Sequence, residues 1–135
     1  MSEPVEPPTP TATYLCFSVG RTRLALPAPM VAEVTPRLPL TALPLAPAHL
    51  LGVVNLRGRP VTVLDLSALI GLGPSRPTDL YIIATALDMR VALPVKRVHG
   101  VEQAPTPPDR PPELARGATL LDLPALLQQA LAMLP

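Results

Sequence analysis

The 135-residue chain has little of what nucleic-acid binding or membrane insertion requires. It has no tryptophan, two tyrosines and one phenylalanine, too few aromatic side chains for a platform on which bases stack. Eleven basic and ten acidic residues leave a net charge of +1, so no basic surplus draws the protein to nucleic acid or to an anionic membrane. No apolar run approaches the roughly 20 residues of a membrane span. We therefore expect neither direct nucleic-acid binding nor membrane insertion.

Cysteine is equally scarce, since Cys16 is the only one. A single cysteine forms no internal disulfide, which suits a reducing compartment. The start of the chain, Met1 to Pro4, is acidic and lacks the apolar run of a signal peptide. We therefore expect a cytoplasmic protein.

Proline, by contrast, is abundant, and its 21 residues exclude long helices from most of the chain. Hydrophobic residues make up 48% of the sequence, enough for one compact domain with a core. We predict an all-β fold with a few short helices. Residues 1–12 hold four prolines and two glutamates and almost nothing apolar, so we expect a disordered tail before a single domain at 13–135.

Short apolar runs predict strands joined in two hairpins. The strands are expected at 14–19, 23–26, 50–56 and 60–64, with a proline-rich connection at 36–47. Leu15, Phe17 and Val19 share one face of the first strand, because side chains alternate along a strand. That face is the expected start of the core.

The tip of the second hairpin carries Asn55, Arg57 and Gly58. Gly58 supplies the positive φ that a tight hairpin turn needs, and the Asn55 side chain can hydrogen-bond the turn backbone. Arg57 has two interpretations. It is either a rigidly presented donor for a partner's carboxylate or carbonyl, or an internal brace to Asp65 or to a carbonyl between two subdomains.

Three helical segments are expected. Residues 29–34 suit one or two helical turns, 66–70 a short helix, and about 123–134 a C-terminal helix. Asp65 and Asp122 precede the last two, where a carboxylate caps backbone N–H groups; capping is favoured over a pair of catalytic carboxylates. The C-terminal helix can pack on its own subdomain, cover an open sheet edge or fill a partner's groove.

The chain also repeats itself. The segments at 14–16 and 23–27 recur 67 residues later, and the Arg-Gly pair at 57–58 recurs at 116–117. Such an internal repeat decides the architecture, so we predict two related β subdomains within the one domain.

The two subdomains are expected at about 13–75 and about 79–123. Equivalent positions of the two copies lie 67 residues apart in the first strands, but Asp65 and Asp122 lie only 57 residues apart. The second copy is therefore ten residues shorter than the first. Residues 102–115 hold five prolines, which cannot donate to a sheet ladder, so the second subdomain should lack one strand. Its open edge would be exposed, covered by the C-terminal helix or paired in a dimer.

Candidates for catalysis or metal binding are few. Cys16 lies in an apolar strand and corresponds to Ile83 in the repeat, which favours a packed side chain over a reactive thiol. His49 and His99 have no second ligand at metal spacing, and no phosphate-binding glycine motif occurs. We expect no enzyme, no cofactor and no metal. What remains is binding by shape, through protein docking or as a small β module for nucleic acid or a small ligand.

The stretch LLGVVNLRGRPVTVLDLSALIGL at 50–72 resembles the signature of CheW-type chemotaxis coupling proteins. The openings of both halves, at 14–34 and 90–102, resemble that family as well. The resemblance implies two SH3-like β-barrel subdomains, here with the second one strand short, plus a C-terminal helix. It also implies a non-enzymatic adaptor between the cytoplasmic tip of a methyl-accepting chemoreceptor and the regulatory domain of a CheA-type histidine kinase, which is itself CheW-like.

The resemblance also points to partner-binding residues. By position these are Val31, Glu33, Gly52, Asn55, Arg57, Gly58, Val95 and Val98. Family members commonly have an acidic residue where this chain has Lys96, which reverses a charge. The missing strand is the larger departure, because a contact surface built from it cannot exist here. The sequence therefore predicts a divergent, shortened adaptor with weakened kinase bridging, for which FrzB-type accessory proteins are the analogy.

Overall fold

The computed structural model describes residues 9–133, and the first eight residues of the expected tail lie outside them. The tail prediction extends too far, because a strand already begins at Thr11. Thr11 and Ala12 pair with Pro105 and Ala104 of a later strand, and the backbone N–H of Thr106 donates to the Pro10 carbonyl at 2.7 Å. This pairing brings both residues into the ordered sheet.

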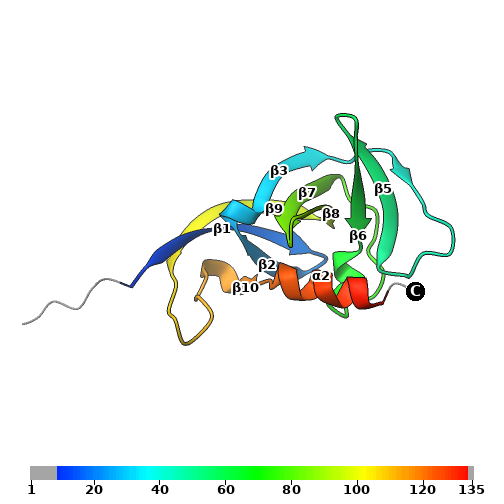
Figure 1. Ribbon diagram of the computed structural model, residues 1–135. Coiled ribbons are helices and arrows are strands. Elements are labelled where there is room, and N and C mark those ends of the chain that lie inside the picture. Colours follow the sequence, from blue (N-terminus) through cyan, green and yellow to red (C-terminus); the bar gives the residue numbers. More distant parts are fainter. Residues whose placement is uncertain (1–8, 134–135) are drawn as a thin grey trace, which may run out of the picture.

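Within residues 9–133, ten strands form two sheets, accompanied by two α-helices and two 3₁₀ turns (Figure 1). In chain order the elements are β1 (Thr11–Val19), β2 (Thr22–Pro27), η1 (Ala28–Met30), β3 (Val31–Pro36), β4 (Leu40–Thr41), β5 (Leu50–Leu56), β6 (Arg59–Leu64), α1 (Leu66–Leu69), β7 (Leu80–Ala86), β8 (Met89–Val95), β9 (Arg97–Pro105), η2 (Ala115–Gly117), β10 (Thr119–Leu120) and α2 (Leu123–Ala132). One sheet has the order β10-β2-β1-β9 and the other β3-β7-β8-β6-β5-β4. The all-β prediction with a C-terminal helix is confirmed.

The two sheets exchange strands between the halves of the chain. β3 follows the β1–β2 hairpin but pairs with β7, and β9 follows the β7–β8 hairpin but pairs with β1. The expected subdomain boundaries at 13–75 and 79–123 are therefore wrong, because each sheet contains strands from both halves. The physical reason is that η1, with its proline, turns the chain away from its own hairpin, so β3 finds its hydrogen-bond partners on β7.

The repeat predicted from the sequence is still visible in the way the strands pair. β6 runs parallel to β8, with Thr62 opposite Val91, and β10 runs parallel to β2, with Thr119 opposite Leu24. These two pairs occupy equivalent repeat positions. In the six-stranded sheet β5 lies beyond β6, whereas in the four-stranded sheet no strand of residues 9–133 lies beyond β10. One of the two β units is therefore short of a strand, as predicted, and that unit is the four-stranded sheet.

The main core lies between the two sheets. Leu15, Phe17 and Val19 of β1 point into it, as predicted, together with Ile82 of β7 and Leu93 of β8. Phe17, Ile82 and Leu93 are fully buried. The opposite face of each sheet has its own smaller cluster, so each central strand buries side chains on both sides.

The helical turns predicted at 29–34 are wrong beyond Met30, whereas the C-terminal helix is present. Residues 29–34 form only one 3₁₀ turn before β3 starts at Val31, because the β-branched Val31, Val34 and Thr35 suit a strand that pairs with β7. In α2, Leu123 and Leu127 join the main core, so the helix packs on its own chain. In Figure 1 it runs along the lower side of the molecule. The expected caps are present, since Asp65 and Asp122 accept N–H groups at 3.2 and 3.1 Å.

A proline-rich segment connects β9 to β10 and packs against the four-stranded sheet. Leu114 and Ala118 pack against the small cluster around Tyr14. The Glu102 carboxylate accepts the backbone N–H of Ala115 at 2.7 Å. A hollow of about 260 Å³ lies between this segment and the sheet, beside Cys16 and Glu102.

Candidate partner-binding surface

The β5–β6 turn is a tight, rigid hairpin tip. Leu56 pairs with Arg59 across it, and the two residues between them have positive φ, +48° at Arg57 and +84° at Gly58. This is the backbone of a two-residue turn that suits the twist of a hairpin. The Asn55 side-chain oxygen accepts the backbone N–H of Gly58 at 2.7 Å. The turn and the role of Asn55 are as predicted.

Arg57 forms a bidentate ion pair with Glu33 of β3. Its Nη1 donates to Oε2 at 3.2 Å, and its Nη2 donates to Oε1. The pair joins the edge strand β3 to the β5–β6 hairpin, from which β7 and β8 separate it in the order of the sheet. The expected brace to Asp65 is wrong, because the Asp65 carboxylate is used by the backbone N–H groups of Ala68 and Ser75.

Solvent reaches both members of this pair. The Arg57 side chain is 68% exposed and that of Glu33 is 30% exposed. The hydrogen bonds from Arg57 lower the pKa of Glu33, and Glu33 in turn raises the pKa of Arg57. Both groups are charged at neutral pH, so the surface presents a fixed guanidinium beside a fixed carboxylate.

Gly52 has a structural role beneath this surface. It is buried, its φ is +149°, and a Cβ placed there would lie 2.2 Å from the Thr41 carbonyl oxygen. Only glycine allows β4 to approach β5 this closely. Gly52 therefore shapes the surface from within and offers no side chain to a partner.

The valines predicted for partner binding fall in different places. Val31 is half-buried on β3 and packs against the main core. Val95 is fully buried, so its prediction as a contact residue is corrected: strand alternation turns it into the core. Val98 is half-buried on β9 of the four-stranded sheet, where it pairs with Phe17 of β1. The structure thus gathers Glu33, Asn55, Arg57 and Gly58 at one surface and leaves Val95 and Val98 outside it.

The sequence interpretation missed several exposed apolar residues near this sheet. Val34, next to Glu33, is 40% exposed, and Leu40, Leu43 and Leu45 of the proline-rich connection are exposed as well. The available signal was a run of leucines among prolines, where no alternation turns side chains inward. The carboxylate partner of Arg57 was also missed, because 24 residues of chain separate it from Glu33.

Two further features, a metal-ligand cluster and a membrane-spanning helix, can be assessed from the geometry of the described residues. Within residues 9–133, no three histidine, cysteine or acidic side chains are grouped so that they could hold a metal ion. No helix in that range is long and apolar enough to span a bilayer.

The chain is similar to known proteins of one domain family. The model of the CheW-like domain family matches residues 13–130. "Protein FrzA" of Myxococcus xanthus is 30% identical over 121 residues, which cover 88% of this chain and 76% of that protein. "Probable chemotaxis protein CheW" of Rhizobium etli is 36% identical over 72 residues, which cover 53% of this chain and only 46% of that protein.

A solved structure shows the same fold. The scaffolding protein TtCheW of Thermoanaerobacter tengcongensis superposes with a TM-score of 0.64 at 28% sequence identity, over 78% of each chain. A match over 78% of the chain is much longer than the signature at 50–72.

Proposed function

This chain belongs to the CheW-like domain family, and from that premise we propose that it is a non-enzymatic, cytoplasmic adaptor in bacterial chemosensory signalling. It binds the cytoplasmic tip of a methyl-accepting chemoreceptor and couples it, with reduced strength, to a CheA-type histidine kinase. The chain spans about half the length of the Rhizobium relative described above, and these partners are our inference for this chain.

The observation that carries the proposal is the surface built by Glu33, Asn55, Arg57 and Gly58. Its backbone is fixed by a two-residue turn and by the Asn55–Gly58 hydrogen bond. Its charged groups are fixed by each other, yet remain open to solvent. A preorganised, exposed guanidinium loses little conformational entropy when it binds a partner's carboxylate or carbonyl.

Weakened coupling to the kinase follows from the four-stranded sheet. The sheet has no counterpart of β5 within residues 9–133, and a proline-rich segment packs against it instead. A partner that binds other family members through this strand would find neither the strand's backbone hydrogen bonds nor its side-chain contacts here. We therefore assign receptor binding to the intact six-stranded sheet and reduced kinase binding to the shortened one.

Separate pull-downs test the two halves of this proposal. The full chain is incubated with a receptor cytoplasmic fragment or with the kinase regulatory domain, and a full-length CheW serves as the reference. We expect retention by the receptor fragment comparable to the reference, and retention by the kinase domain at least tenfold lower. Equal retention by the kinase would overturn the shortened-adaptor part, and loss of receptor retention would overturn the proposal as a whole.

A matched pair of variants locates the receptor contact. Arg57→Met removes the guanidinium from the hairpin tip. Arg21→Met removes another exposed guanidinium, from the β1–β2 turn in the four-stranded sheet. Only Arg57→Met should reduce retention by the receptor fragment. Equal effects of both variants would show that overall charge, and not this surface, drives binding.

A further inference from the structure

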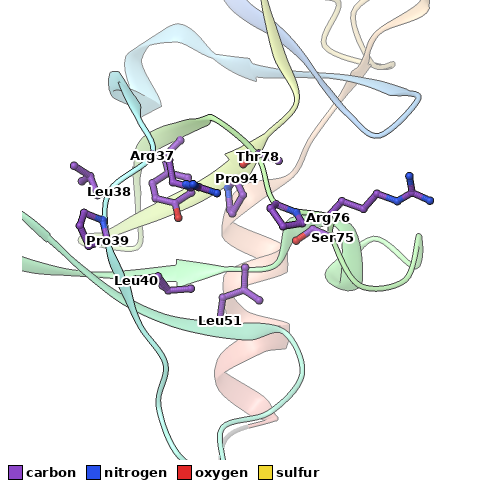
Figure 2. A pocket seen from close by; sticks show the side chains of 11 residues that line it. Arg37, Leu38, Pro39, Leu40, Leu51, Ser75, Arg76, Thr78 and Pro94 are labelled. Carbon is purple, nitrogen blue, oxygen red and sulfur yellow. The ribbon is translucent and has the colours of Figure 1, made fainter.

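A concave site lies beside the start of β5, at the opposite end of that strand from the hairpin tip. It is a cavity of about 600 Å³ between the β3–β4 connection and the loop at 75–78. Figure 2 shows its lining, with Arg37, Leu38 and Leu40 on one side and Ser75 and Thr78 on the other. Its volume is in the range of sites that hold small organic ligands.

Both walls of the cavity are tied to the fold. The backbone N–H of Ser75 donates to the Asp65 carboxylate at 3.0 Å. The backbone N–H of Arg37 donates to the Asp79 carbonyl at 2.9 Å. The first bond anchors the 75–78 loop beside α1, and the second joins the two walls at one end of the cavity. Both use backbone N–H groups, so the cavity does not depend on the side chains that line it for its shape.

The floor is apolar. Leu38 and Leu51 pack against the buried cluster of the six-stranded sheet, and Pro94 of β8 completes the floor. A ligand that covers these three side chains would remove apolar surface from water, which favours an apolar body.

The polar groups are a guanidinium and a phenol. Among the described residues, neither Arg37 nor Arg76 takes part in an ion pair. In Figure 2 the Arg37 side chain runs toward Pro94, whereas Arg76 extends away from the other labelled residues. The Tyr81 phenol also lines the cavity. Burial raises its pKa, and the charge of Arg37 opposes that shift, so at neutral pH Tyr81 keeps its proton and can donate it in a hydrogen bond.

We propose that this cavity binds a carboxylate carried on a compact apolar group, with Arg37 facing the carboxylate and Leu38, Leu51 and Pro94 facing the apolar part. One guanidinium with one neutral donor matches a single negative charge. A phosphate dianion would require more cationic groups than converge here. The carboxylate can come from the free C-terminus of a peptide with apolar last residues or from a small apolar acid. This site does not depend on the proposed adaptor function.

Titration of the ¹⁵N-labelled full chain by NMR tests the proposal with three probes: N-acetyl-Leu-Leu with a free carboxylate, the same dipeptide as its amide, and octanoate. We expect saturable shifts at Leu51, Tyr81 and the 75–78 loop with the free acid, and about tenfold weaker binding of the amide. Octanoate distinguishes the two sources. Its binding favours apolar acids in general, and its failure beside a bound peptide acid favours a peptide terminus.

Two variants complete the test. Arg37→Met keeps the chain length and the backbone bond to Asp79 and should weaken binding of the free acid about tenfold, to the level of the amide. Arg21→Met, which removes a guanidinium elsewhere, should leave binding unchanged. The proposal is overturned if no probe gives saturable shifts, if acid and amide bind equally, or if Arg37→Met binds the acid as well as the wild type does.

Discussion

At the scale of single residues, short-range chemistry was predictable and long-range pairing was not. Gly58 and Asn55 lie three residues apart, so the turn chemistry is written in the local sequence. Arg57 and Glu33 are distant in sequence and meet only because β3 and the β5–β6 hairpin belong to the same folded sheet. No local pattern names Glu33 as the partner of Arg57, and the prediction of Asp65 failed because that carboxylate already caps α1.

A pair of glycine variants tests the residue-scale account of β5. Gly52→Ala should destabilise the protein by more than about 2 kcal/mol, because it combines a strained φ with a clash against the Thr41 carbonyl. Gly58→Ala should cost only about 1–2 kcal/mol, since it meets nothing within 4 Å and only the positive φ is unfavourable. Denaturant unfolding measures both values. A smaller loss for Gly52→Ala than for Gly58→Ala would contradict the close approach of β4.

The Glu33–Arg57 pair makes a prediction about pH. Because the pKa of Glu33 is lowered in the folded state from its ordinary 4.5, the pair's contribution is fully present above that value. It is lost as the pH falls through the lowered folded pKa. An NMR titration of the Glu33 side-chain carboxyl should give a pKa below 4.5 in the wild type and a value closer to 4.5 in Arg57→Met. An unchanged pKa in the variant would show that the ion pair does not form in solution.

At the scale of elements, hairpins and caps were predictable because both are local. Alternation located β1, β2, β5 and β6, and the aspartates before α1 and α2 located the helix starts. β3 was predicted as helical turns, since a short segment after Pro29 carries no alternation strong enough to distinguish a strand. Its pairing with β7 decides its conformation.

Helix α2 gives a prediction at this scale. Leu127 is buried in the main core, whereas Leu131, one turn later, is 43% exposed. Leu127→Ala should cost about 2–5 kcal/mol through lost burial and the cavity it leaves. Leu131→Ala should stay within about 0.5 kcal/mol of the wild type. Chemical denaturation of both variants checks this, and equal costs would mean that α2 does not pack on the core as described.

At the scale of the whole molecule, the internal repeat predicted two related units but not how they combine. Sequence order suggested two consecutive subdomains, whereas β3 and β9 cross between the sheets. Strand exchange leaves no trace in composition or periodicity, because each strand keeps the same pattern whichever hairpin it joins. The prediction for Val95 failed for a related reason. The resemblance placed it at a contact position, but it does not tell which face of the strand is buried, and Val95 lies on the buried face.

The exchange predicts how fragments behave. A cut in the loop between α1 and β7, after Gly73, separates the two sequence halves. Neither half should fold alone, because each would expose a sheet edge and half of the shared core. Mixed together, they should restore a dispersed amide NMR spectrum. A dispersed spectrum from residues 1–73 alone would contradict the exchanged topology.

The central claim is that the surface of Glu33, Asn55, Arg57 and Gly58 binds a chemoreceptor tip. Calorimetric titration of a receptor cytoplasmic fragment with the wild type, Arg57→Glu and the double variant Glu33→Arg/Arg57→Glu tests it most directly. The double variant restores an ion pair but reverses what a partner meets, so it separates an internal brace from a binding group. We predict saturable binding by the wild type and at least tenfold weaker binding by both variants. No binding by the wild type, or full recovery in the double variant, would contradict the account.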